Sequence, residues 1–442
     1  MSYRIRPAKK FRGRWLATGD KSITHRVWLF NALAEGEALI RDPNAGEDCA
    51  RSRALAVALG AQVEPIEDGK RAWRIVGRGG RFRAPAGTID AGNSGTTLRL
   101  ACGLLAAQDF AVTLDGDESL RRRPMARIQV PLAALGATLT LSEAGTAPVH
   151  LQGGPLRGCA YASPVASAQV KSAFLLAALQ AQGESRYSEP LPSRDHSERL
   201  LARMGAAIGL AADGSLRLTG PQALRAVSLQ VPGDLSSAAF LIAAALLVEG
   251  GSVLIKNLGV NPTRTGFLDV VARMGGRFAL YHPREEGGEP VADLLAQHSP
   301  LRATEIRPEE LPRLVDEIPI LAVLAARATG ESHFRGLAEL RVKESDRLAA
   351  TAALLAAFGA GAQVEGNDLR IEGGGGAVLR GSEFAAGGDH RLAMAASVLA
   401  LVGRGESHIT GTRCVATSFP EFPGLLRRFS DGALAQDGEP AC

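Results

Sequence analysis

The most regular feature of the chain is an apolar helical run that ends at a glycine and is followed by a small residue and a strand-like segment. Glycine suits the position after a helix because it adopts the left-handed conformation at little cost. The pattern occurs five times, with glycines 60, 136, 205, 275 and 359, which are 76, 69, 70 and 84 residues apart. A weaker sixth copy ends at residues 425–429. Unrelated helices would not be expected to end alike five times, so we interpret the pattern as an internal repeat.

A period near 70 residues is longer than that of solenoid repeats, so each repeat is expected to be a small α/β module of two helices and several strands. Six modules in 442 residues predict two domains of three modules each. Several Ala-rich helical runs are apolar nearly all round, which is typical of buried helices. They span residues 101–107, 238–247, 321–328, 349–357 and 392–401. The pattern therefore predicts helices inside and sheets outside.

Composition narrows the classes of function. The hydrophobic fraction of 46% and the charged fraction of 22% are typical of a soluble globular protein. A net charge of +4 and an aromatic fraction of 5% do not favour nucleic-acid binding. The longest apolar stretch, residues 238–248, is too short to span a bilayer, and the N-terminus lacks a signal-peptide core. Five dispersed cysteines without a CxxC pair indicate free thiols and a cytoplasmic location, and the eight histidines show no metal-binding spacing.

Polar clusters precede the apolar helices, and the first is the segment Asp-Lys-Ser-Ile-Thr-His-Arg at residues 20–26. Asp20 can cap the helix. Lys21 and Arg26, however, place cations at the end of the helix that its dipole already makes positive. A bound anion such as phosphate or carboxylate would account for this placement. The alternative is a first turn whose cations point into water.

Similar clusters recur at other predicted helix starts: residues 91–99, 121–125, 163–172, 193–198, 314–319, 341–348 and 388–391. Each one alone could be a capped or solvated turn, and the acids Asp316 and Glu317 suit a helix start without any ligand. Together they indicate a cleft for one or two substrates that carry several negative charges. The GxxxxGK[ST] and GxGxxG loops of ATP and dinucleotide sites are absent, and a Ser/His/Asp triad cannot be assembled.

Eight short blocks, seven of which overlap these clusters, occur in the order found in one enzyme family. They are Gly19-Asp20-Lys21-Ser22 with Arg26, Gly92-Asn93-Ser94-Gly95-Thr96, Arg123-Pro124-Met125, Ser167-Ala168-Gln169, Asp316-Glu317, Val342-Lys343-Glu344-Ser345-Asp346-Arg347, Asp389-His390-Arg391 and Thr417-Ser418-Phe419-Pro420. From about Gly19 to Pro423 the chain resembles the 5-enolpyruvylshikimate-3-phosphate (EPSP) synthase family. The segments SAQVKS and SRDHSE are similar to the second subgroup of that family.

The resemblance implies an α/β (α+β) fold of two similar domains. Each domain would consist of three βαβαββ units with buried helices and outer sheets, the inside-out α/β barrel of enolpyruvyl transferases. The first domain is expected at residues 18–231 and the second at residues 1–17 plus 232–442, with a hinge near residues 15–19 and 230–234. Helix N-termini of both domains would face a cleft that ligand anions help to close, because their cations would otherwise repel one another.

The implied reaction transfers the enolpyruvyl group of phosphoenolpyruvate to the 5-hydroxyl of shikimate 3-phosphate, in chorismate and aromatic amino acid biosynthesis. It proceeds by addition and elimination through a tetrahedral intermediate, without metal or organic cofactor. The resemblance implies Asp316 as the base and Glu344, with Lys21, for the proton at the methylene carbon. The implied phosphoenolpyruvate ligands are Lys21, Gly95, Thr96, Arg123, Gln169, Arg347 and Arg391. The implied shikimate 3-phosphate ligands are Lys21, Ser22, Arg26, Ser167, Ala168, Gln169, Arg194, Asp316 and Lys343.

Three positions depart from the commonest form of the family. Ala168 and Arg194 stand where many members have serine, and Thr417 stands where many have a phosphate-binding lysine. The change at Thr417 leaves one cation fewer for phosphoenolpyruvate. Gly95 resembles the herbicide-sensitive form of its position, so we expect glyphosate to inhibit in competition with phosphoenolpyruvate.

Three alternatives stay open at this point. UDP-N-acetylglucosamine enolpyruvyl transferase is expected to carry a cysteine before the Arg123-Pro124 block, and residues 115–122 have none. A non-catalytic ligand-binding relative would have no need of Asp316 and Glu344. An RNA 3′-phosphate cyclase on a related scaffold would need a nucleotide-reactive histidine and a more basic face. Our main expectation is a cytoplasmic monomer that binds two small-molecule substrates, without nucleic acid, membrane or metal.

Overall fold

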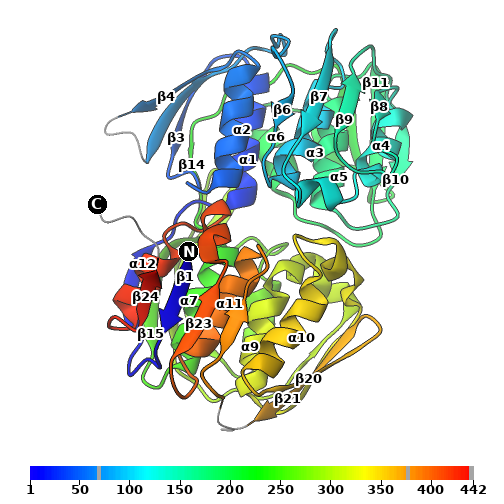
Figure 1. Cartoon of the computed structure of the whole chain (residues 1–442). Coiled ribbons are helices and arrows are strands. Elements are labelled where there is room, and N and C mark those ends of the chain that lie inside the picture. Colours follow the sequence, from blue (N-terminus) through cyan, green and yellow to red (C-terminus); the bar gives the residue numbers. More distant parts are fainter. Residues whose placement is uncertain (67–70, 375–378, 438–442) are drawn as a thin grey trace. The chain divides into compact units, whose positions relative to one another are not determined.

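The structure is a computed structural model of the chain and describes residues 1–66, 71–374 and 379–437. These residues form six four-stranded sheets, twelve α-helices and five short 3-10 helices (Figure 1). The 3-10 helices are η1 (Leu120–Arg122), η2 (Pro308–Arg313), η3 (Val315–Glu317), η4 (Leu337–Val342) and η5 (Thr412–Thr417). In the described ranges, every helix is too short or too polar to cross a bilayer.

Three sheets are built from contiguous segments that read βαβαββ along the chain. In the first, β6 (Ile89–Asp90) is parallel to β7 (Ala111–Asp115), and β9 (Val149–Gln152) runs antiparallel to both β7 and β8 (Thr138–Thr140). The other two repeat this pattern. The strand order of the second sheet is β10 (Ala160–Ala162), β11 (Gly183–Ser188), β13 (Leu216–Gly220), β12 (Ile208–Leu210). The strand order of the third sheet is β18 (Glu305–Ile306), β19 (Thr329–Phe334), β21 (Asp368–Gly374), β20 (Gly361–Glu365).

The remaining three sheets are completed by strands that are distant in sequence. Strand β1 (Ser2–Ile5) pairs antiparallel with both β23 and β24, β2 (Arg12–Leu16) pairs parallel with β15, and β14 (Leu229–Gln230) pairs parallel with β3. The strand orders are β14, β3 (Glu37–Arg41), β5 (Ala72–Val76), β4 (Gln62–Ile66); β16 (Arg277–Glu286), β17 (Glu289–Gln297), β15 (Ser252–Gly259), β2; and β22 (Glu383–Ala385), β23 (Ser407–Thr410), β1, β24 (Leu434–Asp437). The N-terminal strands therefore belong to sheets formed mainly by the C-terminal half of the chain.

The chain divides into two compact units with three sheets each. The N-terminal unit comprises Thr18–Pro232 with Glu285–Glu289, and the C-terminal unit comprises Met1–Ala17, Gly233–Arg284 and the chain from Pro290 onward. The short segment Glu285–Glu289, around the turn between β16 and β17, has no counterpart in the expected division. The hinge near residues 15–19 and 230–234 stays a prediction.

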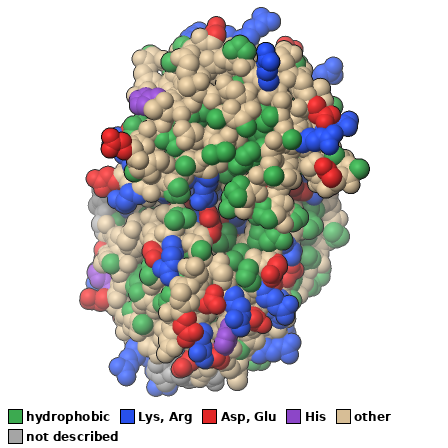
Figure 2. Space-filling view, turned by 90° about the vertical axis from the view of Figure 1, so that its right-hand side faces the viewer, with side chains coloured by type: hydrophobic (Ala, Val, Ile, Leu, Met, Phe, Trp, Pro, Cys, Tyr) green, Lys and Arg blue, Asp and Glu red, His purple; other side chains and the backbone are tan. Residues whose placement is uncertain are grey.

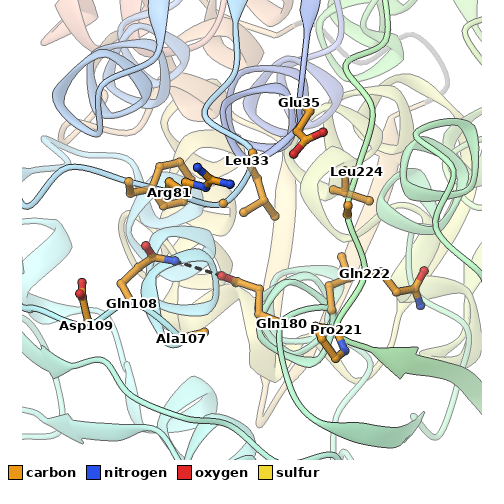
Figure 3. Close-up of a pocket in the computed structure, with 15 residues that line it drawn as sticks. Leu33, Glu35, Arg81, Ala107, Gln108, Asp109, Gln180, Pro221, Gln222 and Leu224 are labelled. Atoms are coloured by element: carbon orange, nitrogen blue, oxygen red, sulfur yellow. Dashed lines mark hydrogen bonds between the residues drawn. The ribbon is translucent and has the colours of Figure 1, made fainter.

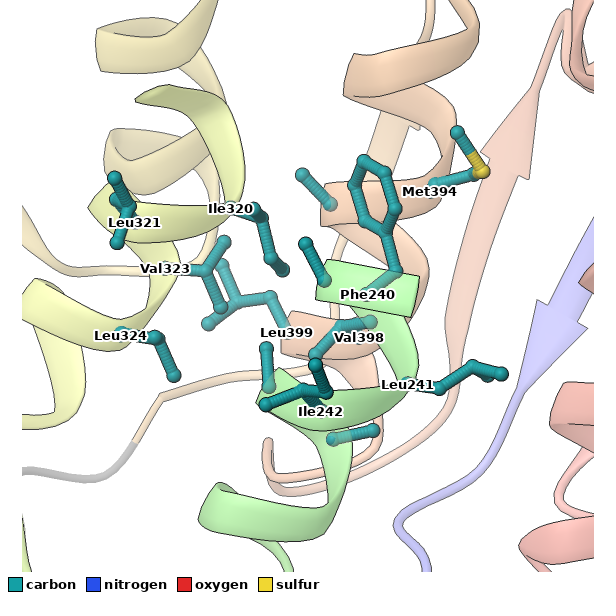
Figure 4. Packing of buried hydrophobic residues seen from close by; sticks show 14 of the residues in the cluster. Phe240, Leu241, Ile242, Ile320, Leu321, Val323, Leu324, Met394, Val398 and Leu399 are labelled. Carbon is teal, nitrogen blue, oxygen red and sulfur yellow. The ribbon is translucent and has the colours of Figure 1, made fainter. Parts of the chain in front are cut away.

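Three buried helices form the core of each unit. They are α1 (Lys21–Leu33), α3 (Gly95–Leu105) and α5 (Ala168–Ala178) in the N-terminal unit, and α7 (Leu235–Leu247), α9 (Ile318–Arg327) and α11 (His390–Ala400) in the C-terminal unit. All eleven residues of α11 are buried. Figure 4 shows side chains of α7, α9 and α11, among them Phe240, Ile320 and Leu399, directed toward one another. The prediction of buried Ala-rich helices is confirmed for these three helices and for α3.

Close packing of the inner helices depends on small residues. A Cβ added at Gly103 in α3 would lie 2.1 Å from the carbonyl oxygen of Ala173 in α5. The two backbones approach so closely there that glycine is required. Burial of each large side chain in these clusters contributes roughly 1.5–3 kcal/mol, so the helices are held mainly by the apolar faces they share.

Six outer helices alternate with the inner ones along the chain: α2 (Glu47–Ala58), α4 (Ala126–Ala134), α6 (His196–Arg203), α8 (Gly266–Arg273), α10 (Arg347–Ala357) and α12 (Phe422–Phe429). The first five are followed by the repeated glycines, whose φ angles are 99°, 101°, 90°, 85° and 81°. The predicted left-handed role of these glycines is confirmed. After α12 the same conformation falls on Asp431, with a φ of 58°.

One predicted buried run is wrong. Residues 349–357 lie in α10, which buries only Arg347, Leu348, Thr351, Leu354 and Leu355. Ala349 and Ala353 are exposed. Alanine is a strong helix former that costs little on a surface, so an Ala-rich run can belong to either kind of helix.

The sheets lie around the three inner helices of their own unit (Figure 1). The expected inside-out α/β barrel is not a closed β-barrel, because the strands of the described ranges form six separate sheets. The clusters singled out in the sequence lie at the N-termini of helices of both kinds: the inner helices α1, α3, α5, α9 and α11, and the outer helices α4, α6 and α10.

Candidate active site

The start of α1 holds one buried cation, Arg26, and one partly buried cation, Lys21. Asp20 Oδ1 accepts a hydrogen bond from the backbone N–H of Ile23 at 2.9 Å, as a helix cap. Lys21 forms an ion pair with Asp48, whose side chain is buried. Arg26 is 2% exposed and donates to Ser197 Oγ and Ser172 Oγ, both at 2.7 Å. A solvated first turn is therefore wrong as an explanation of these cations.

Electrostatics at this helix start favour an added anion. The pKa of Arg26 is lowered to about 10, mainly by burial and also by the nearby Arg194, while carboxylates led by Glu198 act in the opposite direction. Burial, followed by Lys21 and Arg26, holds the pKa of His25 well below its usual range. His25 is therefore neutral at pH 7. A ligand phosphate or carboxylate beside Arg26 and Arg194 would relieve both the desolvation and the repulsion.

The start of α3 joins several of the predicted residues through hydrogen bonds. Gln169 Nε2 donates to Thr96 Oγ1 at 2.9 Å, and Arg99 Nη1 donates to Gln169 Oε1 at 2.6 Å. Arg123 Nη2 donates to Asn93 Oδ1 at 2.6 Å. A Cβ built on Gly95 would lie 2.9 Å from Arg99 Nη1 and 3.5 Å from Arg123 Nη1, so all of these residues surround one site.

Arg99 is a site residue that the sequence interpretation missed. It is only 7% exposed and also donates from Nη2 to the carbonyl oxygen of Pro124 at 3.0 Å. It thus fixes Gln169 from α5 and the Arg123-Pro124 segment together. The available signal was its place at the end of the polar block at residues 91–99, one helical turn after Gly95.

The start of α5 contributes a capped first turn without acidic residues. Ser167 Oγ accepts a hydrogen bond from the backbone N–H of Val170 at 3.4 Å, and the first turn contains no acidic residue. The first residues of the helix are Ala168 and Gln169, whose N–H groups lie at the end that attracts anions. Ser172, one turn further, lies 2.6 Å from Ser197 Oγ and links α5 to the environment of Arg26.

In the C-terminal unit, one buried arginine lies among three carboxylates. Arg347 Nε donates to Asp389 Oδ2 at 2.7 Å, its Nη1 lies 3.5 Å from Asp316 Oδ1, and its Nη2 forms an ion pair with Glu344. Burial alone would lower the pKa of Arg347, but Asp389, Glu344 and Asp316 outweigh it and raise that pKa. Lys343 Nζ also lies 3.5 Å from Asp316 Oδ1. Asp316 and Glu344 stay accessible, each with 15% of its side chain exposed.

Arg391 is held by a second carboxylate that the sequence interpretation did not assign. Its Nη1 donates to the carbonyl oxygen of Asp316 at 2.8 Å and to Glu317 Oε1 at 3.3 Å. Glu317 is buried and also accepts from Arg264 Nη1 at 3.1 Å and from Ser236 Oγ. Arg264, which is 5% exposed, was missed as well, because it is the single cation of residues 257–265 and does not belong to a cluster of charged residues.

The predicted residues thus fall into two half-sites, each within one unit. The N-terminal half-site contains Lys21, Ser22, Arg26, Gly95, Thr96, Arg123, Ser167, Ala168, Gln169 and Arg194. The C-terminal half-site contains Asp316, Lys343, Glu344, Arg347 and Arg391. Thr417 lies in η5 of the C-terminal unit, where its hydroxyl donates to the carbonyl oxygen of Cys414 at 2.7 Å.

A cavity of about 500 Å³ in the N-terminal unit lies elsewhere (Figure 3). It is lined by Leu33, Ala107 and Gln180, which follow or end α1, α3 and α5, and Gln108 Nε2 donates to Gln180 Oε1 at 3.1 Å there. The carbonyl ends of three helices make this a poor place for an anion. Its lining contains none of the residues of the N-terminal half-site.

One face of the molecule shows how its surface charges are distributed. On the face shown in Figure 2, basic side chains lie among acidic ones, and its described residues form no broad basic tract. This agrees with the small net charge of +4. The cations that matter are the buried ones of the half-sites.

Comparison with known proteins points to the same family over nearly the whole chain. A model of the family described as EPSP synthase (3-phosphoshikimate 1-carboxyvinyltransferase) matches residues 5–426. The chain is 48% identical over 430 residues to a 3-phosphoshikimate 1-carboxyvinyltransferase of Acidiphilium cryptum, covering 96% of this chain and 95% of that protein. For the protein of the same name in Brevibacillus brevis the identity is 43% over 430 residues, covering 97% and 99%.

Solved structures agree with this. EPSP synthase from Acinetobacter baumannii matches with a TM-score of 0.86 at 39% identity, covering 98% of this chain and 100% of that chain. The enolpyruvyl transferase NikO from Streptomyces tendae matches with a TM-score of 0.81 at 19% identity, covering 99% of both chains. The second similarity is one of fold alone.

Proposed function

The chain belongs to the EPSP synthase (3-phosphoshikimate 1-carboxyvinyltransferase) family, and on that premise we propose how its two half-sites share the reaction. The enzyme transfers the enolpyruvyl group of phosphoenolpyruvate to the 5-hydroxyl of shikimate 3-phosphate, giving 5-enolpyruvylshikimate 3-phosphate and phosphate. The matches do not support UDP-N-acetylglucosamine as the acceptor. We assign the roles of individual residues from the contacts and charges within each half-site.

Shikimate 3-phosphate binds at the starts of α1 and α5. Ser22, Arg26, Ser167, Ala168, Gln169 and Arg194 form the N-terminal part of its site, with Lys21 beside it. Two arginines close enough to repel each other, together with a helix N-terminus that lacks acids, are suited to a phosphate. Asp316 and Lys343 of the C-terminal half-site complete the contacts to the ring hydroxyls of this substrate.

Phosphoenolpyruvate binds between cations of both half-sites. Lys21, Gly95, Thr96, Arg123 and Gln169 supply one side, and Arg347 and Arg391 supply the other. Arginine forks match carboxylate and phosphate oxygens in pairs. Thr417 supplies a hydroxyl instead of a cation, so the arginines carry more of the charge neutralisation here.

Proton transfer depends on the two accessible carboxylates beside Arg347. Asp316 accepts the proton of the 5-hydroxyl of shikimate 3-phosphate while the hydroxyl oxygen attacks C2 of phosphoenolpyruvate. Glu344, with Lys21, protonates C3. In the elimination, the new methyl group loses a proton, the C2–O bond to phosphate breaks and the vinyl group forms again. The observation that carries this assignment is that Asp316 and Glu344 both lie against one buried guanidinium and remain accessible.

Further parts of the proposal concern the whole protein. The substrates bridge the half-sites, with a hinge near residues 15–19 and 230–234. The enzyme acts as a cytoplasmic monomer, and the four free cysteines among the described residues favour the cytoplasmic location. Size-exclusion chromatography tests the monomer, and small-angle scattering with and without both ligands tests the hinge.

The roles are tested by phosphate release from phosphoenolpyruvate, with and without shikimate 3-phosphate, in Asp316→Asn and Glu344→Gln. Each variant is expected to lose about 10²–10⁴-fold in kcat, the usual worth of a general acid or base. The Kd for shikimate 3-phosphate, measured by calorimetry, should change little. Wild-type turnover in both variants would show the roles to be wrong, and release with UDP-N-acetylglucosamine instead would overturn the acceptor.

A further inference from the structure

We propose that Glu189 and Lys171 are positioning residues that hold the shikimate 3-phosphate half-site in one geometry. The inference rests on the proposed function, because it concerns the segments assigned to that substrate. Neither residue is among the expected ligands. Both contact the segments that carry the expected ligand residues. We call Glu189, Lys171 and Glu198 together the clamp.

Glu189 joins the two segments that are expected to hold the phosphate. Its Oε1 accepts hydrogen bonds from the backbone N–H and the hydroxyl of Ser193, both at 2.8 Å. Its Oε2 accepts from the backbone N–H of Ser167 at 3.3 Å and from Ser193 Oγ at 2.9 Å. Ser167 is the cap of α5, and Ser193 directly precedes Arg194. One carboxylate therefore sets the distance between the helix start and the arginine loop.

Lys171 extends the clamp to α6. Its Nζ lies 3.0 Å from Glu189 Oε1 and 2.7 Å from Glu198 Oε1, and it donates to the carbonyl oxygen of Ser193 at 3.2 Å. The three N–H donors of the ammonium group thus have three acceptors. Its side chain is only 3% exposed.

Through α6 the clamp reaches Arg26. Glu198 follows Ser197, whose hydroxyl accepts from Arg26 Nε at 2.7 Å. Glu198 is also the foremost of the carboxylates that counter the depression of the Arg26 pKa. The clamp therefore connects the three parts of the N-terminal half-site that we assign to shikimate 3-phosphate: the α5 start, the segment that carries Arg194, and the surroundings of Arg26.

Stability alone does not explain such a group. Replacing a buried ion pair by apolar side chains of similar size is often neutral or stabilising, because desolvation offsets the attraction. The clamp places two carboxylates and one lysine at a position where apolar side chains would stabilise the fold equally well. Ligand geometry is a better explanation, since small displacements of binding groups weaken binding strongly.

The test compares binding of shikimate 3-phosphate with binding of shikimate, which lacks the phosphate, by calorimetry. Glu189→Gln keeps the volume but loses the charge and turns an amide N–H₂ toward donors. We expect its Kd for shikimate 3-phosphate to rise about tenfold or more, the usual effect of losing a charge-assisted hydrogen bond. Its Kd for shikimate should rise much less, so the preference for the phosphorylated ligand falls. The KM for shikimate 3-phosphate should rise with it, with kcat within about threefold.

Three further variants make the result decisive. Glu184→Gln removes an exposed carboxylate from neighbouring β11 and should leave both Kd values unchanged. Glu189→Asp keeps the charge and should recover part of the preference. Lys171→Met should lower the preference for shikimate 3-phosphate over shikimate. In the double variant with Glu189→Gln, the Lys171→Met substitution should lower this preference by less than it does alone, as expected for residues that act as one coupled group.

A lower unfolding temperature with an unchanged preference in Glu189→Gln would show a purely structural role and overturn the inference. If that variant does not fold, the preference of Glu189→Asp decides in the same way. Arg194→Ala separates the clamp from the substrate assignment. Weaker binding in Arg194→Ala beside an unchanged preference in the Glu189 variants refutes the clamp alone, whereas unchanged binding in Arg194→Ala refutes the substrate assignment on which it rests.

Discussion

Arg347 and Asp389 form an ion pair whose two side chains are almost completely buried, 1% and 0% exposed, with Nε and Oδ2 2.7 Å apart. Asp389 serves two purposes, because its Oδ1 also accepts the backbone N–H of Arg391 at 3.0 Å as the cap of α11. One carboxylate therefore orients two arginines that we assign to phosphoenolpyruvate.

Asp389→Asn separates these two roles. Asparagine is as good a helix cap as aspartate, so the cap should survive, but Arg347 loses the charge of its closest partner. Removing one member of a buried pair costs about 3–5 kcal/mol. We expect a lower unfolding temperature by calorimetry and a raised KM for phosphoenolpyruvate. Asp437→Asn, which breaks an exposed pair with Arg4, is the control and should leave both unchanged; equal effects in the two variants would contradict the special role of Asp389.

Gly95 should control sensitivity to glyphosate. A Cβ at this position would crowd Arg99 Nη1 at 2.9 Å and contact Arg123 Nη1 at 3.5 Å. Because the first of these atoms ends a flexible side chain, Gly95→Ala should fold. Because the added methyl group narrows the site, the variant should raise the inhibition constant of glyphosate about tenfold or more. The KM for phosphoenolpyruvate should rise by a smaller factor. Inhibition kinetics at varied phosphoenolpyruvate measure both constants.

The matched control for that substitution is Gly424→Ala in α12, where a Cβ would meet no atom within 4 Å. It should not change inhibition. Glyphosate inhibition of the wild type that does not compete with phosphoenolpyruvate would contradict the assignment of Gly95 to that site.

His25 should make stability depend on pH. Its pKa is well below 6.5 in the folded protein because of burial, then Lys21 and Arg26. Below pH 6.5 the unfolded chain therefore binds a proton that the folded chain does not, so this contribution is complete above pH 6.5 and is lost as the pH falls. The loss is at most about 1.4 kcal/mol per pH unit for one proton.

His25→Asn keeps a polar side chain near Ser52 and removes the titrating group. The unfolding temperature of this variant should fall less steeply than that of the wild type between pH 6.5 and pH 5. The comparison starts from pH 8, where the imidazole of His25 is neutral in both the folded and the unfolded wild type. Calorimetry over this range checks the expectation, and equal slopes for the two proteins would refute it.

The repeated glycines should be needed for their backbone conformation rather than for space. At Gly205, with a φ of 90°, an added Cβ would meet no atom within 4 Å. Gly205→Ala should therefore cost only the left-handed strain, about 1–2 kcal/mol, or roughly 2–4 °C in unfolding temperature per kcal/mol. Gly154→Ala, which has equal space and no positive φ, is the control. A loss of equal size in both variants would contradict this explanation.

Local signals predicted much of the fold. The glycines after the outer helices, the inner apolar helices and the polar clusters at helix starts reflect conformational preference and hydrophobic pattern within a few residues. The error at α10 has the same origin, because the composition of an Ala-rich run does not say which face meets a neighbour. Order along the chain then made the eight blocks specific for one family.

The sequence by itself determined which residues we assign to the chemistry, since cations at helix starts conflict with the helix dipole wherever they occur. Only the tertiary structure decided what fixes them. Arg99, Arg264 and Glu317 reach the half-sites through hydrogen bonds between segments far apart in the chain, as Lys171 and Glu189 do. Such partners are selected by distance and burial in the folded state, and no local pattern encodes either quantity.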